Sequence, residues 1–194
     1  MNYVAGTYAS LHAGGPVRDI ILDRVPTLPV NLIFIDGAFA FWLFVFVLLA
    51  AMPRTVPFVL KVLSVFIVIR SFFVILTHLG APAHEALLDP NRIMSDLTFS
   101  GDLFFSGHTG FPFLLALTFW ENTLLRRVFL VSAGVFASAV LVGHLHYSID
   151  VFAAFFITDS IFRLAQRLFP HEYEMLWKRV GRLGRRTRLP VYST

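Results

Sequence analysis

The chain has 194 residues, of which 57% are hydrophobic and only 14% are charged. Water-soluble globular domains carry about 25% charged residues, so this composition excludes an ordinary soluble domain and indicates an integral membrane protein. Twenty-two phenylalanines suit a hydrocarbon solvent. The absence of cysteine excludes disulfides, thiolate zinc sites and cysteine nucleophiles.

The net charge of +4 does not point to nucleic acid, because many of the basic residues lie together after the last apolar segment. A basic tail in that position contacts anionic lipid headgroups, and an exposed tail without a partner is the alternative. Six residues form this cluster: Lys178, Arg179, Arg182, Arg185, Arg186 and Arg188. We expect contact with membrane lipids and no nucleic-acid partner.

Residues 1–30 are predicted to form an N-terminal interfacial segment. They contain no basic stretch followed by an apolar run, so we expect no cleavable signal peptide. Residues 17–25 are amphipathic but too short to span a bilayer. They predict a short helix on the membrane surface, with a soluble cap helix as the alternative.

Five apolar runs follow, and a membrane-spanning helix needs roughly 20 such residues to cross about 30 Å of hydrocarbon. The runs cover about 31–52, 56–76, 104–120, 128–143 and 149–164. We therefore predict an all-α integral membrane fold. A bundle of about five transmembrane helices would occupy residues 31–166, and residues 167–194 would form the basic tail.

The basic residues between the runs predict an orientation. Arg54, Arg126 and Arg127 lie in the two loops on one side of the bundle, which the tail joins. Since basic loops stay in the cytoplasm, that side is predicted to be cytoplasmic. The loop at 77–102 and the turn at 143–147 then face the opposite, exoplasmic side.

Two short segments, 101–109 and 144–150, reach this exoplasmic boundary and bring histidines and acids with them. His146 and Asp150 are four residues apart, so on a helix they share one face. The carboxylate can then accept a proton from one imidazole nitrogen and leave the other nucleophilic. The spacing favours a histidine nucleophile, although a lone interfacial histidine is the simpler reading of each residue by itself.

The first segment has the features of a phosphate site. Gly107 has no Cβ to keep an anion away, and Ser106 lies where a helix begins, so that backbone N–H groups can point at phosphate oxygens. His108 would stand beside the bound phosphate. Asp102 either caps the helix start or orients a histidine.

Arg70 lies within the second apolar run, where an ionisable residue is a functional candidate. It would bind the phosphate, and an ion pair with Asp36 is the structural alternative. A metal site built from His108, His144 and His146 is disfavoured, because the last two diverge on a helix and no acidic cluster joins them. We expect neither a metal nor an organic cofactor.

These segments resemble a known family. Gly-Asp-x-x-x-Ser-Gly-His-Thr at 101–109 and His-Tyr-Ser-x-Asp-Val at 146–151 are similar to the third and fourth motifs of the sphingomyelin synthase family. That family is a branch of the type 2 phosphatidic acid phosphatase superfamily. Arg70 and Thr77 match the Arg-x(6)-Thr of its second motif.

The resemblance implies a membrane phospholipid headgroup phosphotransferase. His146 would be the nucleophile, Asp150 would orient it, and His108 would protonate the leaving alcohol. The acceptor would be ceramide, diacylglycerol or a related alcohol. Use of water instead would make the protein a lipid phosphatase or phospholipase C-type hydrolase, and an inactive lipid-binding protein is a third hypothesis.

The sequence departs from both branches of the superfamily. Ala139 and Val140 stand where the phosphatase branch has a Ser-Arg pair, whereas His144 matches a histidine of sphingomyelin synthases. This favours a phosphodiester over a phosphate monoester. The family has six spans and this chain is predicted to have five. We expect six residues to bind substrate: Arg70, Asp102, Ser106, Gly107, His144 and Tyr147.

Overall fold

The computed structural model describes residues 2–82 and 104–177, and within them every regular element is a helix. The predicted all-α class is confirmed. The helices are α1 (Asn2–Leu11), α2 (Ala38–Ala51), α3 (Val56–Leu76), α4 (Gly107–Thr118), α5 (Thr123–Val142), α6 (Ser148–Leu168) and α7 (Pro170–Trp177). Two shorter elements complete the set, a 3-10 turn η1 (Leu22–Arg24) and a π-helix η2 (Leu32–Gly37).

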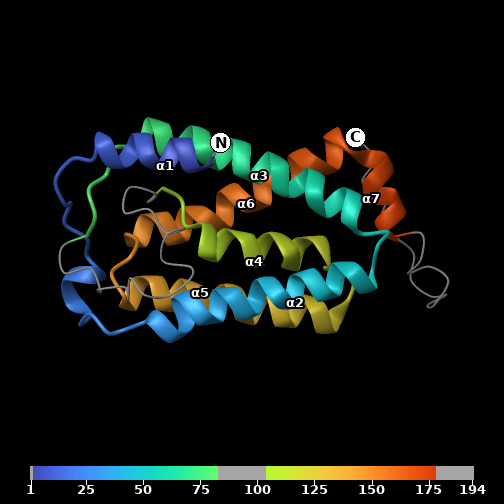
Figure 1. The fold of residues 1–194 in the computed structure, drawn as a ribbon, viewed down its shortest axis with the longest axis horizontal. Helices are drawn as coiled ribbons and strands as arrows, with labels where there is room; N and C mark the ends of the chain where they lie inside the picture. The colour runs from blue at the N-terminus through green and yellow to red at the C-terminus, as the bar shows by residue number, and fades with distance from the viewer. Residues whose placement is uncertain (1, 83–103, 178–194) are drawn as a thin grey trace.

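The helices α2 to α6 run roughly along the long axis of the molecule, and α1 lies beside α3 (Figure 1). We call one end of the bundle the loop end. It contains residues 12–31, residues 77–82 and the α5–α6 turn at 143–147 (Figure 1). The opposite, α7 end contains α7 with the α2–α3 and α4–α5 turns (Figure 1).

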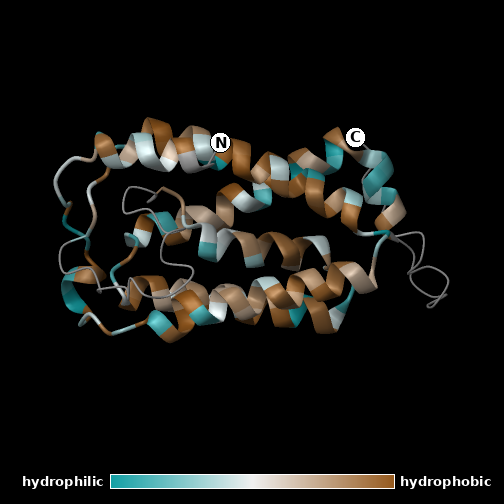
Figure 2. Cartoon of the chain, in the orientation of Figure 1, coloured by the Kyte–Doolittle hydropathy of each residue, from teal (hydrophilic) through white to brown (hydrophobic). Residues whose placement is uncertain are grey.

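Three helical segments are long and apolar enough to cross a membrane: Leu32–Ala51, Val56–Leu76 and Thr123–Val142. Large apolar side chains on their outer faces stay exposed, including Phe46 at 71% and Phe72 at 60%. Figure 2 shows these helices as mostly hydrophobic along their length. An exposed apolar surface of this extent is stable in lipid rather than in water, as expected for an integral membrane protein.

The third predicted run is shorter than expected. Its helix α4 has 12 residues, which rise about 18 Å, less than the hydrocarbon thickness. The chain leaves the helix after Thr118 because Asn122 already caps α5, where its side chain accepts a hydrogen bond from Leu125 N at 3.1 Å. As a result α5 begins at Thr123, five residues before the predicted start at 128.

The last predicted run matches α6, which has 21 residues. It is long enough to span, but it carries two acids and two arginines, and it is not among the three apolar segments. Arg163 pairs with Asp159 at 2.7 Å on the exposed face, as the i, i+4 spacing predicts.

The predicted interfacial helix at 17–25 is wrong in position. Only η1, three residues long, is helical there, and the N-terminal helix is α1, whose Ala5 and Ala9 pack on Val74 of α3. The bracketing glycines and prolines of this segment disfavour a helix. Asp19 also accepts hydrogen bonds from Ile21 N and Leu22 N, and this closes a local turn in place of a helix.

The residues directly after α6 are ordered by packing. In α7, Tyr173 and Leu176 belong to the apolar cluster that contains Phe58 and Phe162. Lys61 Nζ lies 2.5 Å from Glu172 Oε1 across the same contact. The basic cluster at 178–188 falls outside the described residues.

The centre of the bundle is closely packed where α4 crosses α3 and α6. A Cβ placed on Gly110 would lie 2.9 Å from both the Phe66 ring and Thr158 Oγ1, so that a larger residue would force these side chains to move. This close approach sets the position of α4 along α6. The two predicted motifs, one at the start of each helix, therefore meet.

Candidate active site

The two motif segments meet at the loop end. Ser106 N, at the start of α4, donates a hydrogen bond to Asp150 O in the first turn of α6 at 3.2 Å. Ser106 and Asp150 are both fully buried. The junction brings the start of the predicted phosphate loop directly against the turn that carries the predicted nucleophile.

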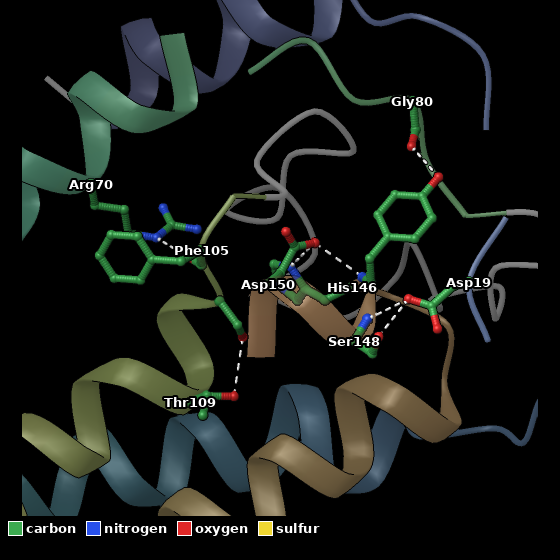
Figure 3. Close-up of polar contacts among 10 residues, drawn as sticks. Asp19, Arg70, Gly80, Phe105, Thr109, His146, Ser148 and Asp150 are labelled. Atoms are coloured by element: carbon green, nitrogen blue, oxygen red, sulfur yellow. Dashed lines mark hydrogen bonds and ion pairs between the residues drawn. The ribbon is translucent and has the colours of Figure 1, made fainter. Parts of the chain in front are cut away.

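His146 and Asp150 lie side by side, although His146 is in the turn before α6 and not on the helix face that the spacing predicts. The His146 Nδ1 to Asp150 Oδ2 distance is 3.8 Å, and both side chains are buried (Figure 3). The same Oδ2 accepts a hydrogen bond from Tyr147 N at 3.0 Å and so caps α6. Asp150 Oδ1 has no hydrogen-bond partner within the described part of the chain. A small approach of the imidazole would complete the predicted His–Asp pair.

Arg70 reaches the same junction from α3. Its Nε donates to Phe105 O at 2.9 Å, and the side chain is only 6% exposed (Figure 3). The guanidinium lies against Gly107: a Cβ placed there would be 3.2 Å from Arg70 Nε and 3.4 Å from Cζ. Asp36, the alternative partner considered for Arg70, is exposed. A cation is therefore held at the N-terminus of α4, where an anion is also favoured by the backbone amides.

The hydroxyl groups at the start of α4 are buried as well. Thr109 Oγ1 donates to Ser106 Oγ at 3.3 Å, and both residues are 0% exposed. Gly110 N donates to Ser106 O at 2.9 Å, which begins the α4 hydrogen-bond ladder. The arrangement is that of a rigid helix start rather than a mobile loop.

His108 stands on an aromatic face. Its ring stacks on Phe34, with centroids 4.1 Å apart and planes inclined by 29°, and Phe136 lies 6.0 Å away. Phe34 belongs to η2, and π-helical turns are frequent at functional sites because they re-aim side chains. This contact was missed by the sequence analysis, because Phe34 lies in an apolar run in which any phenylalanine resembles a lipid-facing residue.

His144 ends α5. It has a left-handed φ of 51°, and its N–H bonds to Leu141 O while Leu145 N bonds to Val140 O. These two bonds define a Schellman cap, a position usually taken by glycine. His144 Nε2 lies 2.9 Å from Val25 O, and the residue is 5% exposed.

Tyr147 is engaged through its hydroxyl. The OH donates to Gly80 O at 2.8 Å and accepts from Val17 N at 3.0 Å, and the side chain is 3% exposed. A substrate contact through Tyr147 remains a prediction, as does one through His144. Asp102 lies outside the described residues.

Asp19 is a buried acid of this end that the sequence analysis did not single out. Its Oδ2 accepts hydrogen bonds from Ser148 N at 2.7 Å and Ser148 Oγ at 2.8 Å (Figure 3). Burial by itself raises the pKa of Asp19, but the hydrogen bonds from Ser148, Ile21 and Leu22 outweigh it and hold the pKa below its usual value. A partner so distant in sequence leaves no local signal that could have revealed it.

The wall behind the site is apolar. Ala139 and Val140, which replace the phosphatase Ser-Arg pair, are buried in a cluster with Phe34 and Leu145. In the described part of the chain, no three His, Asp or Glu side chains are grouped closely enough to hold a metal ion. Arg70 is the arginine that the described structure brings to the start of α4.

Fold and site together define a class: an all-α membrane protein that gathers an arginine and a His–Asp pair at a helix start near one end of its bundle. Residues 100–167 match the family model described as PAP2 superfamily C-terminal. The chain is also 28% identical over 211 residues to sphingomyelin synthase-related protein 1 of Mus musculus and, equally, to the Homo sapiens protein of that name.

These matches agree with the resemblance predicted from the motifs: residues 100–167 are similar to the PAP2 superfamily, and the chain as a whole is similar to sphingomyelin synthase-related proteins. The alignments with the two relatives cover 92% of this chain but only 42% of the mouse protein and 49% of the human one. The chain therefore spans about half or less of the length of these relatives. No solved structure matches it.

Proposed function

We propose that the protein is a headgroup phosphotransferase that moves the phosphoryl headgroup of a phospholipid to a lipid alcohol such as ceramide or diacylglycerol. The observation that carries this proposal is the junction of Ser106 with Asp150, beside the Arg70 guanidinium that rests on Gly107. It combines an anion site and a histidine–carboxylate pair within one buried cluster.

The first half-reaction uses His146 as the nucleophile. Asp150 faces Nδ1, so Nε2 attacks the phosphorus of the donor. The bond between phosphorus and the diacylglycerol oxygen breaks, and His108 protonates that oxygen as it leaves. The headgroup phosphate remains bonded to His146, while Arg70 and the amides at Ser106–Gly107 balance the charge on its oxygens.

In the second half-reaction His108, now neutral, takes the proton of the acceptor hydroxyl. The acceptor oxygen attacks the phosphorus, the bond to His146 Nε2 breaks, and the product phosphodiester leaves. Stacking of His108 on Phe34 supports this role, because the contact holds the imidazole in one orientation beside the start of α4.

The donor is proposed to be a phosphodiester. A dianionic monoester such as phosphatidic acid is best bound by an additional arginine whose guanidinium donates two hydrogen bonds to the phosphate. The apolar Ala139 and Val140 supply none, and a diester monoanion needs only one cation, here Arg70.

Hydrolysis is the second candidate function, because water in place of the lipid alcohol completes the same two steps. The buried state of His146 and Asp150 favours transfer, since exclusion of water suppresses hydrolysis of a reactive intermediate.

The proposal includes a topology. The loop end and its site would face the exoplasmic side, and the residues after α7 would be cytoplasmic. Arg54 lies in the α2–α3 turn, and Arg126 and Arg127, which were predicted to lie in a loop, lie near the start of α5, so all three are at the α7 end. Residues 1–30 would form an interfacial cover, 31–166 the catalytic bundle and 167–194 the basic extension. A reporter fused after Thr194 that is active only outside the cytoplasm would contradict this orientation.

The test supplies the purified protein with phosphatidylcholine or phosphatidylethanolamine labelled in the headgroup, with and without ceramide. The proposal expects label in a new lipid only when ceramide is present. Label released as free phosphorylated headgroup at the same rate in both arms would make the protein a hydrolase. His171→Ala, an exposed histidine in α7, should behave as the wild type.

A further inference from the structure

We propose that residues 17–25, which we call the strap, position the turn that carries the nucleophile, and that Asp19 is the positioning residue. The inference rests on the proposed function for the identity of the reaction. The strap itself is outside the motifs that carry the family resemblance.

Four hydrogen bonds join the strap to the turn and to the first residue of α6. Val17 N donates to Tyr147 OH at 3.0 Å, and Asp19 Oδ2 accepts from Ser148 N at 2.7 Å and from Ser148 Oγ at 2.8 Å. At the far end of the strap, Val25 O is 2.9 Å from His144 Nε2. The contacts fall on both sides of His146, two residues before it and one and two residues after it.

Asp19 accepts the two shortest of these hydrogen bonds, at 2.7 and 2.8 Å. Ser148 is the first residue of α6, so its N–H has no partner inside the helix and must find one elsewhere. A carboxylate at this point also interacts favourably with the helix dipole. The side chain is only 8% exposed, and little water is therefore available to take its place.

The other oxygen of Asp19 fixes the carboxylate to its own segment. Oδ1 accepts from Ile21 N at 2.9 Å and Leu22 N at 3.2 Å, and Leu22 packs against the Tyr147 side chain. One carboxylate oxygen therefore accepts hydrogen bonds from the strap, and the other accepts hydrogen bonds from the start of α6. An asparagine has one acceptor oxygen and can satisfy only one of these two sets.

The segment that follows α3 contacts the chain directly before the strap. Gly14 N donates to His78 O at 2.9 Å just before the strap begins, and Gly80 approaches the Gly14 backbone so closely that any Cβ there would clash. Gly80 O also accepts the Tyr147 hydroxyl. The strap, the segment after α3 and the turn therefore form one connected support for the start of α6.

Loss of this support is expected to move His146 relative to the bound phosphate. A displacement of about 1 Å at a reacting group can lower the rate roughly 10²-fold without a comparable change in binding. Because Arg70 and Gly107 belong to other elements, the phosphate site should keep its affinity. The effect should therefore appear in kcat and much less in KM.

The experiment compares Asp19→Ala, Asp19→Asn and Ser148→Ala with Asp23→Asn as the matched control. Asp23 is in the same segment but pairs with Arg18 at the surface. We expect kcat to fall roughly 10²-fold in Asp19→Ala, less in Asp19→Asn, and only a few-fold in Ser148→Ala, which keeps the backbone N–H. Asp23→Asn should retain the wild-type kcat.

Amide hydrogen exchange gives a second readout that does not depend on activity. Asp19→Ala should accelerate exchange in residues 144–150 and leave α5 and the body of α6 protected, whereas Asp23→Asn should not. If folded Asp19→Ala keeps both the wild-type kcat and the wild-type exchange, the strap does not position the turn. A lowered melting temperature with unchanged kcat would likewise overturn the positioning role.

The two proposals fail in different ways. A wild-type protein without transfer or hydrolysis contradicts the proposed function, and the exchange measurement then still decides whether the strap holds the turn. If Asp19→Ala does not fold, Asp19→Asn and Ser148→Ala carry the same comparison. Unchanged exchange in both would refute the strap.

Discussion

The two ends of the bundle use charge differently. At the α7 end, charged residues pair at the surface: the Lys61 and Glu172 side chains are 43% and 19% exposed, and those of Arg163 and Asp159 are 71% and 38% exposed. At the loop end, Asp19, Arg70 and Asp150 are each less than 9% exposed.

This difference has an energetic meaning. Exposed ion pairs contribute about 0–1 kcal/mol and are easily replaced. Buried polar groups lose several kcal/mol of hydration, which only well-formed hydrogen bonds recover. Within the described residues, the buried arginine and the buried acids lie at the loop end, where the proposed chemistry occurs, and that contrast can be tested by substitution.

The largest effect is expected from the two histidines of the site. His146→Ala removes the proposed nucleophile, and His108→Ala removes the proposed acid–base catalyst, a type of group that contributes about 10²–10⁴-fold. Both variants should fold in detergent and lose turnover. Wild-type turnover in either variant would show that its histidine has no catalytic role.

Arg70→Lys should have the next largest effect on activity, and the matched substitution at the α7 end should have almost none. Lysine keeps the charge but cannot reproduce the planar guanidinium that contacts Gly107 and Phe105 O. We expect a loss of roughly 1.5–3 kcal/mol in kcat/KM, the range for a hydrogen bond to a charged group. Lys61→Arg, the matched exchange at the α7 end, should change activity by less than about twofold, since its ion pair is partly exposed. If the two substitutions changed activity equally, the proposed difference between the loop end and the α7 end would be wrong.

Asp19→Asn tests the buried carboxylate through stability. Since the folded-state pKa of Asp19 lies below its usual value, the ionised form stabilises the fold at neutral pH. That contribution is present above the unfolded value of about 3.9 and is lost as the pH falls through the folded pKa. The variant should be less stable than the wild type by about 1–3 kcal/mol at pH 7, with a smaller difference below about pH 4. A difference that grows on acidification would have the wrong sign.

The smallest predicted effect concerns His144. Alanine at φ 51° is strained by about 1 kcal/mol relative to glycine, so His144→Ala should be less stable than His144→Gly by about that amount. If the residue acts through the cap and Val25, His144→Gly should keep the higher activity. Equal increases of KM in both variants would instead show that the imidazole touches substrate.

The sequence predicted those parts of the molecule that depend on local pattern. Apolar length placed α3 at its observed bounds and α6 within a few residues. His146 and Asp150 are adjacent, but His146 lies in the turn before α6 and not on the shared helix face from which the four-residue spacing was interpreted. The start of α5 was missed because Asn122, a polar residue in a loop, acts as its cap.

What could not be predicted depends on contacts between distant segments. Asp19 was interpreted as part of an amphipathic helix because its partner, Ser148, is 129 residues away. The stacking of Phe34 on His108 depends on a π-helical turn for which the apolar run at 31–52 contains no signal. Periodicity reports which face of an element is apolar, but not which residue of another element covers it.

In the proposed mechanism the phosphoryl headgroup is covalently bonded to His146 between the two half-reactions. This covalent intermediate can be trapped. The protein would be mixed with a headgroup-labelled phospholipid without acceptor, quenched at alkaline pH, digested and analysed by mass spectrometry. The account predicts an acid-labile phosphorylated adduct on His146 that disappears when ceramide is added and is absent from His146→Ala. Steady turnover with no adduct on His146, or with the adduct on another residue, would contradict it.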